Sequence, residues 1–445
     1  MRAIVMAMLI TLCGAGEHVL TVDPTAVAVD GFLGFGAEWD PNFWSEAGVA
    51  KGADEATWGR VVGRVRWMRL PIARVMIQCR WHLREDGTHD WDAPMMRALC
   101  RHLDVCQELG TQVILTEWGC ATWSKMPWIT GNEDPRYADA VVASVAHLRR
   151  RYDCIRWLVL VNEPNFEGGG WDKWSTGVRQ VAERLRAADS PVTMMGPDSA
   201  HDRAWHQRGV AELKDVFTAW DLHRYHHDAE CRAGGLETYV AEHWADVRAG
   251  DPDAARKPLI VGEAGMQDGM DASRNPHIEE HGYGAFMVDY AAQATRAGSH
   301  AVLAWMLDDS CHDGFTWGMW TDVAGGQRLK RWAWPWMLLA RCVPRGSTLL
   351  RVEAPPGVRV IAARLPDGAG WTFAVVNRGD ATADFRLRVP GGGRLALLSY
   401  RYATGALAVD GDGLPSAQGD DEADLDTGVR LQVGADEVAV LTSVR

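Results

Sequence analysis

RWLVLVNEPN, residues 156–165, is an apolar run that ends abruptly at Asn162, Glu163 and Pro164. A continuous apolar run of this length is typical of a strand that is buried on both faces, as in a parallel sheet. Proline cannot continue the hydrogen-bond ladder, so the strand should stop there and leave Asn162 and Glu163 at its carboxyl end. A carboxylate in that position is costly to bury unless it is paired or takes part in chemistry.

A second stretch repeats this pattern. PLIVGEAG, residues 258–265, is again an apolar run that leads into a glutamate, Glu263. The chain therefore places two glutamates at the ends of two strands that we expect to be buried. A pair of carboxyl groups on one site is what the cleavage of a glycosidic bond requires, because one must donate a proton while the other is ionised.

These two strands belong to a longer series in which strand and helix patterns alternate. Alternation of this kind implies a parallel sheet with right-handed crossovers. Eight such units in about 300 residues fit a closed (β/α)₈ barrel, the TIM barrel, better than an open sheet. The expected strands lie near 32–38, 72–78, 112–116, 157–161, 192–198, 219–225, 258–263 and 301–306, and the expected helices near 58–68, 94–109, 137–151, 174–188, 236–248, 283–297 and 332–342.

The alternation of strand and helix patterns stops at about residue 347. Short β-type runs separated by Pro, Gly and Asp turns follow, without a convincing helix, and they predict an antiparallel β-sandwich. We therefore expect an α/β barrel domain over residues 17–345 and a C-terminal β-sandwich domain over residues 346–445.

Residues 1–16 have one positive charge, a short apolar core and then small residues. This pattern resembles a secretory signal peptide, which would make the protein secreted or periplasmic. The alternative is a buried first strand in a cytoplasmic protein. No other stretch is long and apolar enough to suggest an integral membrane segment.

The composition narrows the range of partners. A hydrophobic content of 47% and a charged content of 24% describe an ordinary soluble globular protein. A net charge of −13 argues against nucleic acid or an anionic membrane surface as a partner. The 22 tryptophans outnumber the 8 tyrosines and 9 phenylalanines, and although most should pack in the core, their wide apolar faces suit sugar rings. None of the nine cysteines forms a C-x-x-C pair, so a zinc or thioredoxin-like site has no support, while disulfide status and oligomeric state stay open.

In a barrel of this kind, functional groups gather at the carboxyl ends of the strands. Glu117 also follows a buried strand but lacks the Asn-before, Pro-after context, so it could contact substrate or be structural, and the same holds for Glu38 and Trp39. Asp198 is expected to cap a loop. The strand ends, in order, carry Glu38, Trp39, Arg74, Glu117, Trp118, Asn162, Glu163, Asp198, His223, Tyr225, Glu263 and Trp305.

These residues make the chain resemble the clan A (β/α)₈ retaining glycoside hydrolases, a superfamily with cellulase-like and β-xylosidase-like members. The resemblance covers roughly residues 28–343, and the C-terminal sandwich resembles the small β-domain that packs against the barrel in several of these families. The features that carry it are Asn162-Glu163-Pro164 on the fourth strand, Glu263 on the seventh, His223-Arg224-Tyr225 on the sixth, Arg74 on the second and Trp305 on the eighth.

The resemblance implies roles for the two glutamates and their neighbours. Glu163 would be the general acid and base, and Glu263 the nucleophile, with net retention at the anomeric carbon. Arg74 and Tyr225 would lower the pKa of Glu263, whereas Glu163 would need a drier environment. Asn162 would hydrogen-bond the sugar 2-hydroxyl.

The resemblance also implies contacts with the substrate for two further residues. His223 would support Glu163 or the sugar, and Trp305 would form a platform under the sugar ring. Trp118, Glu117 and Trp39 complete the expected substrate-binding set.

The expected substrate is therefore a polysaccharide or oligosaccharide, cleaved at an O-glycosidic bond without a cofactor or metal. Three alternatives remain open: a catalytically silent carbohydrate-binding barrel, a transglycosidase that uses the same glutamates, and a metal-dependent barrel hydrolase. The last would use His201, His206, His223, His226 and His227, but His223, His226 and His227 lie on and just beyond one strand, where alternation should scatter their directions. The structural alternative for Glu163 and Glu263 is a pair of side chains that only closes the barrel mouth.

Overall fold

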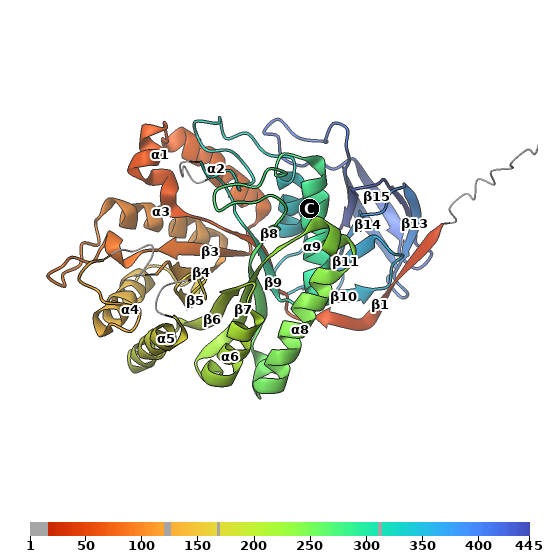
Figure 1. The fold of residues 1–445 in the computed structure, drawn as a ribbon. Coiled ribbons are helices and arrows are strands. Elements are labelled where there is room, and N and C mark those ends of the chain that lie inside the picture. The colour runs from red at the N-terminus through yellow and green to blue at the C-terminus, as the bar shows by residue number, and fades with distance from the viewer. Residues whose placement is uncertain (1–16, 120–125, 167–169, 310–313) are drawn as a thin grey trace, which may run out of the picture.

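The computed structural model describes residues 17–119, 126–166, 170–309 and 314–445 (Figure 1). The leader-like segment 1–16 lies outside the described residues. Two β-structures stand side by side, a barrel surrounded by helices and a sheet domain formed mainly by the C-terminal part of the chain (Figure 1).

The barrel is closed and consists of eight strands in chain order, paired in parallel throughout. This confirms the predicted (β/α)₈ architecture. The strands are β2 (Gly34–Glu38), β3 (Ile72–Ile77), β4 (Gln112–Glu117), β5 (Ile155–Leu160), β6 (Thr193–Ala200), β7 (Phe217–His226), β8 (Leu259–Met266) and β9 (Ala301–Ala304).

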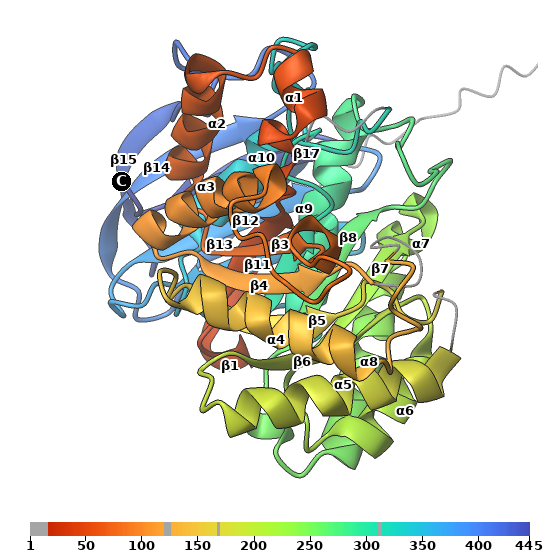
Figure 2. The same cartoon turned by 90° about the vertical axis from the view of Figure 1, so that its left-hand side faces the viewer.

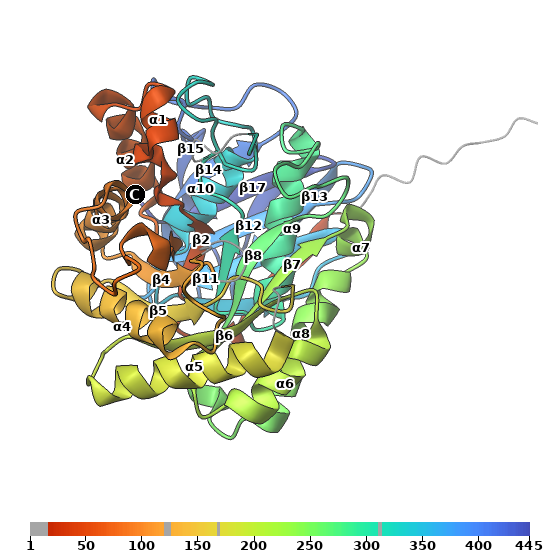
Figure 3. The same ribbon diagram turned by 60° about the vertical axis from the view of Figure 1, so that its left-hand side comes forward.

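Helices follow the strands and cover the outside of the barrel (Figures 2 and 3). Their ends carry the expected signals: helix α3 begins at Pro94 and ends at Gly110, which adopts φ 67°. The helix α6 was not predicted. The main helices are α2 (Glu55–Met68), α3 (Pro94–Leu109), α4 (Pro135–Arg149), α5 (Gly170–Ala187), α6 (Arg203–Leu213), α8 (Gly235–Gly250), α9 (His281–Arg296) and α10 (Ala333–Cys342); shorter turns are α1 (Glu46–Ala50), α7 (Asp228–Arg232), η1 (Pro41–Trp44), η2 (Cys79–Trp81) and η3 (Ala254–Arg256).

Side chains fill the inside of the barrel. Because successive strand residues point to opposite faces, one set packs against the helices and the other meets at the barrel axis. The axial set comprises Ile72, Ile114, Trp157, Val159, Met195, Ala219, Ile260, Ala301 and Leu303, all buried. The barrel is therefore a packed core, and a site can form only at its open end.

The second domain is a mostly antiparallel β-sandwich of nine strands in the order β15-β14-β17-β12-β11-β10-β1-β13-β16. It confirms the predicted sandwich. Its C-terminal strands are β10 (Thr348–Val352), β11 (Val358–Arg364), β12 (Trp371–Asn377), β13 (Ala383–Arg388), β14 (Arg394–Tyr402), β15 (Gly419–Asp424), β16 (Val429–Val433) and β17 (Glu437–Thr442).

The first strand corrects the predicted domain boundary. We expected residues from 17 onward in the barrel domain, but β1 (His18–Val29) pairs in parallel with β13 and antiparallel with β10. Its apolar side chains Leu20 and Val22 are fully buried in the core of the sandwich. The red strand β1 accordingly lies among the blue strands in Figure 1, so the sandwich combines both ends of the described chain.

Within the described ranges, no helix combines the length and the apolar character needed to cross a bilayer.

Candidate active site

Glu163 lies on a turn directly after strand β5. The backbone at Val161 and at Glu163 has φ angles of 71° and 47°, in the left-handed region that non-glycine residues rarely adopt. Each such residue costs about 1–3 kcal/mol, so neighbouring groups must hold the turn in place. The Val161 N–H donates to the Glu117 carbonyl at 3.0 Å, and the Glu163 N–H donates to Asp198 Oδ2 at 3.2 Å.

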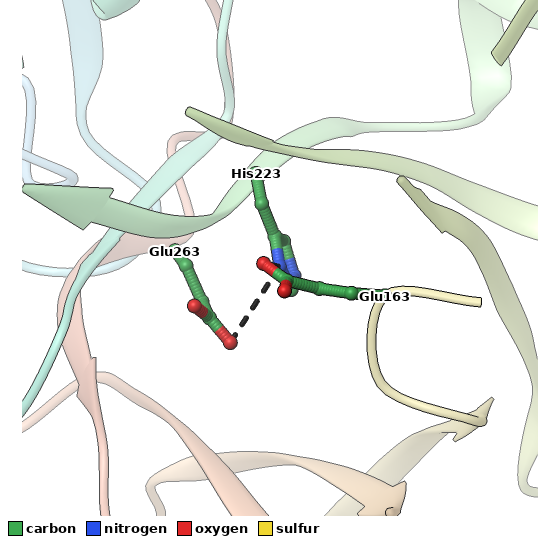
Figure 4. Close-up of side chains that lie close together, drawn as sticks. All are labelled: Glu163, His223 and Glu263. Carbon is green, nitrogen blue, oxygen red and sulfur yellow. Dashed lines mark hydrogen bonds and ion pairs between the residues drawn. The ribbon is translucent and has the colours of Figure 1, made fainter. Parts of the chain in front are cut away.

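Glu263 lies within strand β8, on the opposite side of the same opening (Figure 4). Its Oε1 accepts a hydrogen bond from Arg74 at 2.7 Å, and its Oε2 accepts one from the Tyr225 hydroxyl at 2.8 Å. The preceding residue is Gly262, where a Cβ would come within 3.0 Å of the His223 ring. A glycine at this position thus lets strand β8 approach His223 closely.

His223 on strand β7 stands between the two glutamates (Figure 4). Its Nδ1 lies 3.0 Å from Glu163 Oε1 and 3.5 Å from Glu263 Oε1. One oxygen of each glutamate and a ring nitrogen of His223 all lie within 4.8 Å of one another. The two carboxyl groups that the sequence placed on separate strands therefore meet in one site.

Arg74 is fully buried and connects five strand ends. Glu117 is not among its hydrogen-bond partners. Instead its two terminal nitrogens donate to Glu38 at 3.0 Å, Glu263 at 2.7 Å, Asn162 Oδ1 at 2.7 Å and Asp198 at 2.9 Å. Because Arg74 binds Asn162 through the amide oxygen, the amide nitrogen of Asn162 stays available as a donor.

The pKa of Glu263 differs from the expectation. Burial raises the pKa of Glu263 from its usual 4.5 to about 7, and the nearby charge of Glu163 raises it further, while His223 and Arg74 lower it. Arg74 and Tyr225 make the predicted contacts, but the predicted net lowering of the pKa is wrong, because the loss of water outweighs them.

The environments of the two glutamates are also reversed relative to the prediction. The side chain of Glu163 is 22% exposed and that of Glu263 only 4%. We expected Glu163 in the drier position. The reason is local: the turn after β5 directs Glu163 into the opening, whereas Glu263 sits within its strand.

Other groups in the cluster have shifted pKa values as well. Burial alone would lower the pKa of His223, but the carboxylates of Asp198 and Glu263 raise it well above its usual value. Burial raises the pKa of Glu38 and of Asp221 well above the usual range. Burial disfavours the charge of Asp198 too, yet Arg74 and His223 together hold the pKa of that carboxyl below its usual value.

A cavity of about 680 Å³ opens above this cluster. Trp118 and Trp305 face each other in its wall, with ring centroids 6.2 Å apart and planes inclined by 20°. Arg74 and His223 support the site from below and do not line the cavity. Its lining combines predicted residues (Trp118, Asn162, Glu163, Tyr225, Glu263 and Trp305) with others that we did not predict, among them Asp40, Asn42, Trp81, Met270, Phe315 and Trp317.

Two predicted substrate contacts lie elsewhere. Glu117 is fully buried, and its carboxylate accepts hydrogen bonds from the backbone N–H groups of Cys79 and Gly119 and from the Tyr137 hydroxyl. Trp39 is also fully buried and packs against Trp58 and His102. Neither lines the cavity, so the structure assigns both to the support of the fold.

Asp198 has a larger part in the site than its sequence context indicates. We expected a loop cap, but its carboxylate lies at the centre of the cluster, in contact with Arg74, His223 and the backbone of Glu163. Its position at the end of the fifth barrel strand was the only available signal, and the strand ends were already the place to look.

The donor set does not favour a metal ion. The described part of the chain contains two groups of three potential ligands. One group is Glu163, His223 and Glu263, and the other is Asp198, Asp221 and His223. The guanidinium of Arg74 lies 2.7 Å from Glu263 and 2.9 Å from Asp198, so a permanent positive charge already neutralises these carboxylates. Of the five histidines considered from the sequence, only His223 belongs to either group.

Comparison with known proteins gives a fold but no family. No family model and no curated protein matches the sequence. Among solved structures, a GH30 endoxylanase from Clostridium papyrosolvens C71 is 13% identical, with 96% of this chain and 100% of that chain covered and a TM-score of 0.68. A GH51 α-L-arabinofuranosidase from Thermotoga petrophila RKU-1 is 15% identical over 96% and 100% of the two chains, with a TM-score of 0.69. A glucosidase from Croceicoccus marinus is 13% identical over 97% and 99%, also with a TM-score of 0.69. The predicted resemblance to the clan A glycoside hydrolases is thus confirmed at the level of the fold, for barrel and sandwich together.

Proposed function

We propose that this protein is a retaining glycoside hydrolase that cleaves O-glycosidic bonds of a polysaccharide or oligosaccharide. The observation that carries the proposal is the closeness of Glu163 and Glu263, whose nearest carboxyl oxygens lie within 4.8 Å at the edge of one cavity. Retaining enzymes hold their two carboxyl groups about 5–5.5 Å apart, whereas inverting enzymes need about 6.5–9.5 Å to admit a water molecule. The short separation supports double displacement.

In the first step, the carboxylate of Glu263 attacks the anomeric carbon while Glu163 donates its proton to the glycosidic oxygen. The bond to the leaving sugar breaks, and an ester forms between the anomeric carbon and Glu263. In the second step, the Glu163 carboxylate removes a proton from water, whose oxygen attacks the same carbon and releases Glu263. Two inversions give net retention.

The neighbouring groups suit these steps. Arg74 and Tyr225 hold the two oxygens of Glu263 by hydrogen bonds of 2.7 and 2.8 Å, which orient the nucleophile. The free amide donor of Asn162 faces a cavity whose wall contains the indoles of Trp118 and Trp305. Indole faces offer sugar rings a wide apolar surface. The names of the three structural neighbours, an endoxylanase, an arabinofuranosidase and a glucosidase, also point to glycosidic bonds but to different sugars.

The alternatives receive less support. A silent carbohydrate-binding protein would have no need for two glutamates this close, because a buried carboxyl pair is costly. A transglycosidase would share the first step and use a sugar hydroxyl in place of water in the second. Analysis of products in the presence of acceptor sugars distinguishes it.

The test begins with a panel of aryl glycosides and polysaccharides to identify a substrate. Glu263→Ala should then abolish turnover, and added azide should restore product of inverted configuration, because azide occupies the space of the missing carboxylate. Glu353→Ala, in an exposed carboxylate of the sandwich domain, is the matched control and should retain activity. Near-normal turnover by Glu263→Ala would contradict the assignment of Glu263 as the nucleophile.

The role of Glu163 as general acid is tested by a comparison of substrates with different leaving groups. Glu163→Ala should retain most activity on aryl glycosides whose phenols are acidic, because such phenols leave without a proton. It should lose about 10²–10⁴-fold on poor leaving groups, the usual contribution of a general acid. Equal losses across the series contradict the acid role.

We also propose that residues 1–16 are a cleaved secretory leader, in accordance with their sequence pattern. Mass spectrometry of the protein from its native host should find an N-terminus near residue 17. An intact Met1 on the folded intracellular protein contradicts secretion.

A further inference from the structure

Asp198 is linked to both glutamates of the proposed catalytic pair through His223 and Arg74, without reaching the cavity. Its Oδ1 lies 3.0 Å from His223 Nε2, and the other ring nitrogen of His223 lies 3.0 Å from Glu163. Its Oδ2 accepts from Arg74 at 2.9 Å, and Arg74 in turn holds Glu263. Asp198 is fully buried and does not line the cavity, so it cannot touch a substrate there.

A second buried aspartate holds Asp198 in place. Asp221 lies on strand β7, fully buried, and its Oδ1 accepts the backbone N–H of Asp198 at 2.7 Å. The backbone of Asp198 has a φ of 55°, in the left-handed region, so the conformation needs such support. Asp221, Asp198 and His223 place a polar atom each within 4.8 Å of one another.

We infer that Asp198, held by Asp221, is a positioning residue that keeps the ring of His223 protonated, so that His223 Nδ1 donates to the carboxylate that Glu163 becomes when it gives up its proton. The inference deepens the proposed function and rests on it. It adds a chain of contacts, from Asp221 through Asp198 and His223 to Glu163, behind the acid.

The donors and acceptors around His223 fix where its protons lie. An ionised carboxylate has no proton to donate, so the ring nitrogen that faces Asp198 must carry the hydrogen. In the charged ring the opposite nitrogen carries a hydrogen as well, and it donates to Glu163. When Glu163 gives its proton to the leaving oxygen, a positively charged His223 between Asp198 and Glu163 stabilises the new carboxylate.

The surroundings of His223 agree with a charged ring. It faces Asp198 from β6, Glu163 from the turn after β5 and Glu263 from β8, with Arg74 and Asp221 behind. Carboxylates raise the pKa of His223, and Arg74 and His223 lower that of Asp198.

The experiment uses Asp198→Asn in the full-length protein, because asparagine keeps the size and an acceptor oxygen but removes the charge. Activity on poor leaving groups should fall at least tenfold, and activity on good leaving groups should fall less. In ¹⁵N-histidine NMR, both ring nitrogens of His223 should stay protonated through neutral pH in the wild type and lose a proton at lower pH in the variant. Asp251→Asn is the matched control, since Asp251 is a buried, ion-paired aspartate outside the cluster; it should move neither readout.

The outcomes separate the inference from the proposed function. A leaving-group-independent loss in Asp198→Asn, beside the expected response of Glu163→Ala, refutes the link through His223. A wild-type His223 that titrates near the ordinary pH of an imidazole refutes it without any assay of activity. If Asp198→Asn does not fold, Asp221→Ala tests the same chain and should show a smaller loss with the same dependence on the leaving group; a uniform loss refutes the link. Absence of leaving-group dependence in Glu163→Ala itself refutes the proposed function.

Discussion

Replacement of Glu263 by glutamine should stabilise the protein at pH 8 relative to the wild type, and much less so at pH 4.5. Glutamine has nearly the size of a protonated glutamate and carries no charge. The comparison therefore isolates the free energy of holding a negative charge at this buried position, beside Arg74 and Tyr225 but also near Glu163. It needs no substrate.

The sign follows from the pKa of Glu263, which burial raises from 4.5 to about 7. Between these two values the folded protein binds more protons at this site than the unfolded chain does, so its free energy of unfolding falls as the pH rises. A difference of about 2.5 pKa units corresponds to about 3 kcal/mol. With an unfolding entropy of about 2 cal/mol/K per residue, a chain of 445 residues converts this free energy into about 3 °C of melting temperature.

The assay is thermal unfolding of the wild type and Glu263→Gln at several pH values between 4.5 and 8. The difference in melting temperature should grow by about 3 °C over this range and level off above pH 7. Glu353→Gln, at an exposed carboxylate, should show no such trend. A difference that is constant, or that shrinks as the pH rises, would mean that Arg74 and Tyr225 outweigh burial after all, as the sequence alone suggested.

Two further substitutions separate catalytic support from structural support. Tyr225→Phe removes a hydrogen bond to Glu263 and should lower kcat/KM on aryl glycosides about tenfold to a hundredfold. This loss is the equivalent of about 1.5–3 kcal/mol, the usual value of a hydrogen bond to a charged group. An unchanged kcat/KM contradicts the assigned contact. Trp39→Ala should cost about 3–5 kcal/mol of stability, as expected for a large buried side chain, and should leave the KM of the folded enzyme unchanged. A raised KM at normal stability would mean that Trp39 contacts the substrate.

The sequence predicted the parts of the site that lie on or next to barrel strands. Asn162, Glu163, Glu263 and Tyr225 each follow or belong to a buried strand, and the barrel topology brings strand ends together without further information. Glu117 shows where this reasoning stops. It ends a strand as Glu163 nearly does, yet its carboxylate binds the backbone N–H groups of Cys79, after strand β3, and of Gly119, after its own strand. The direction of such a side chain depends on loop conformation, which strand patterns do not encode.

Other features depend on contacts between distant segments. Nothing local in residues 18–29 shows that the partners of β1 lie at 348–352 and 383–388. The contacts of Arg74 and Tyr225 with Glu263 were predicted, while the sign of the pKa shift was not, because it depends on how much water the folded protein excludes. Trp317 and Phe315 line the cavity from a segment without regular structure, so no periodicity could have placed them.

The balance of charge in the buried cluster gives a reason why Glu163 can act first as an acid and then as a base. Burial raises the pKa of Glu38 and of Asp221 and so disfavours their charged forms, which leaves the cations Arg74 and His223 to face mainly the carboxyls of Asp198, Glu163 and Glu263. Two cations face three carboxyls, and the charge of Glu163 raises the pKa of Glu263, so the pair disfavours two negative charges at once. Formation of the glycosyl ester removes the charge of Glu263 and with it this repulsion. The acid of the first step thus becomes the base of the second without any movement of the surrounding residues.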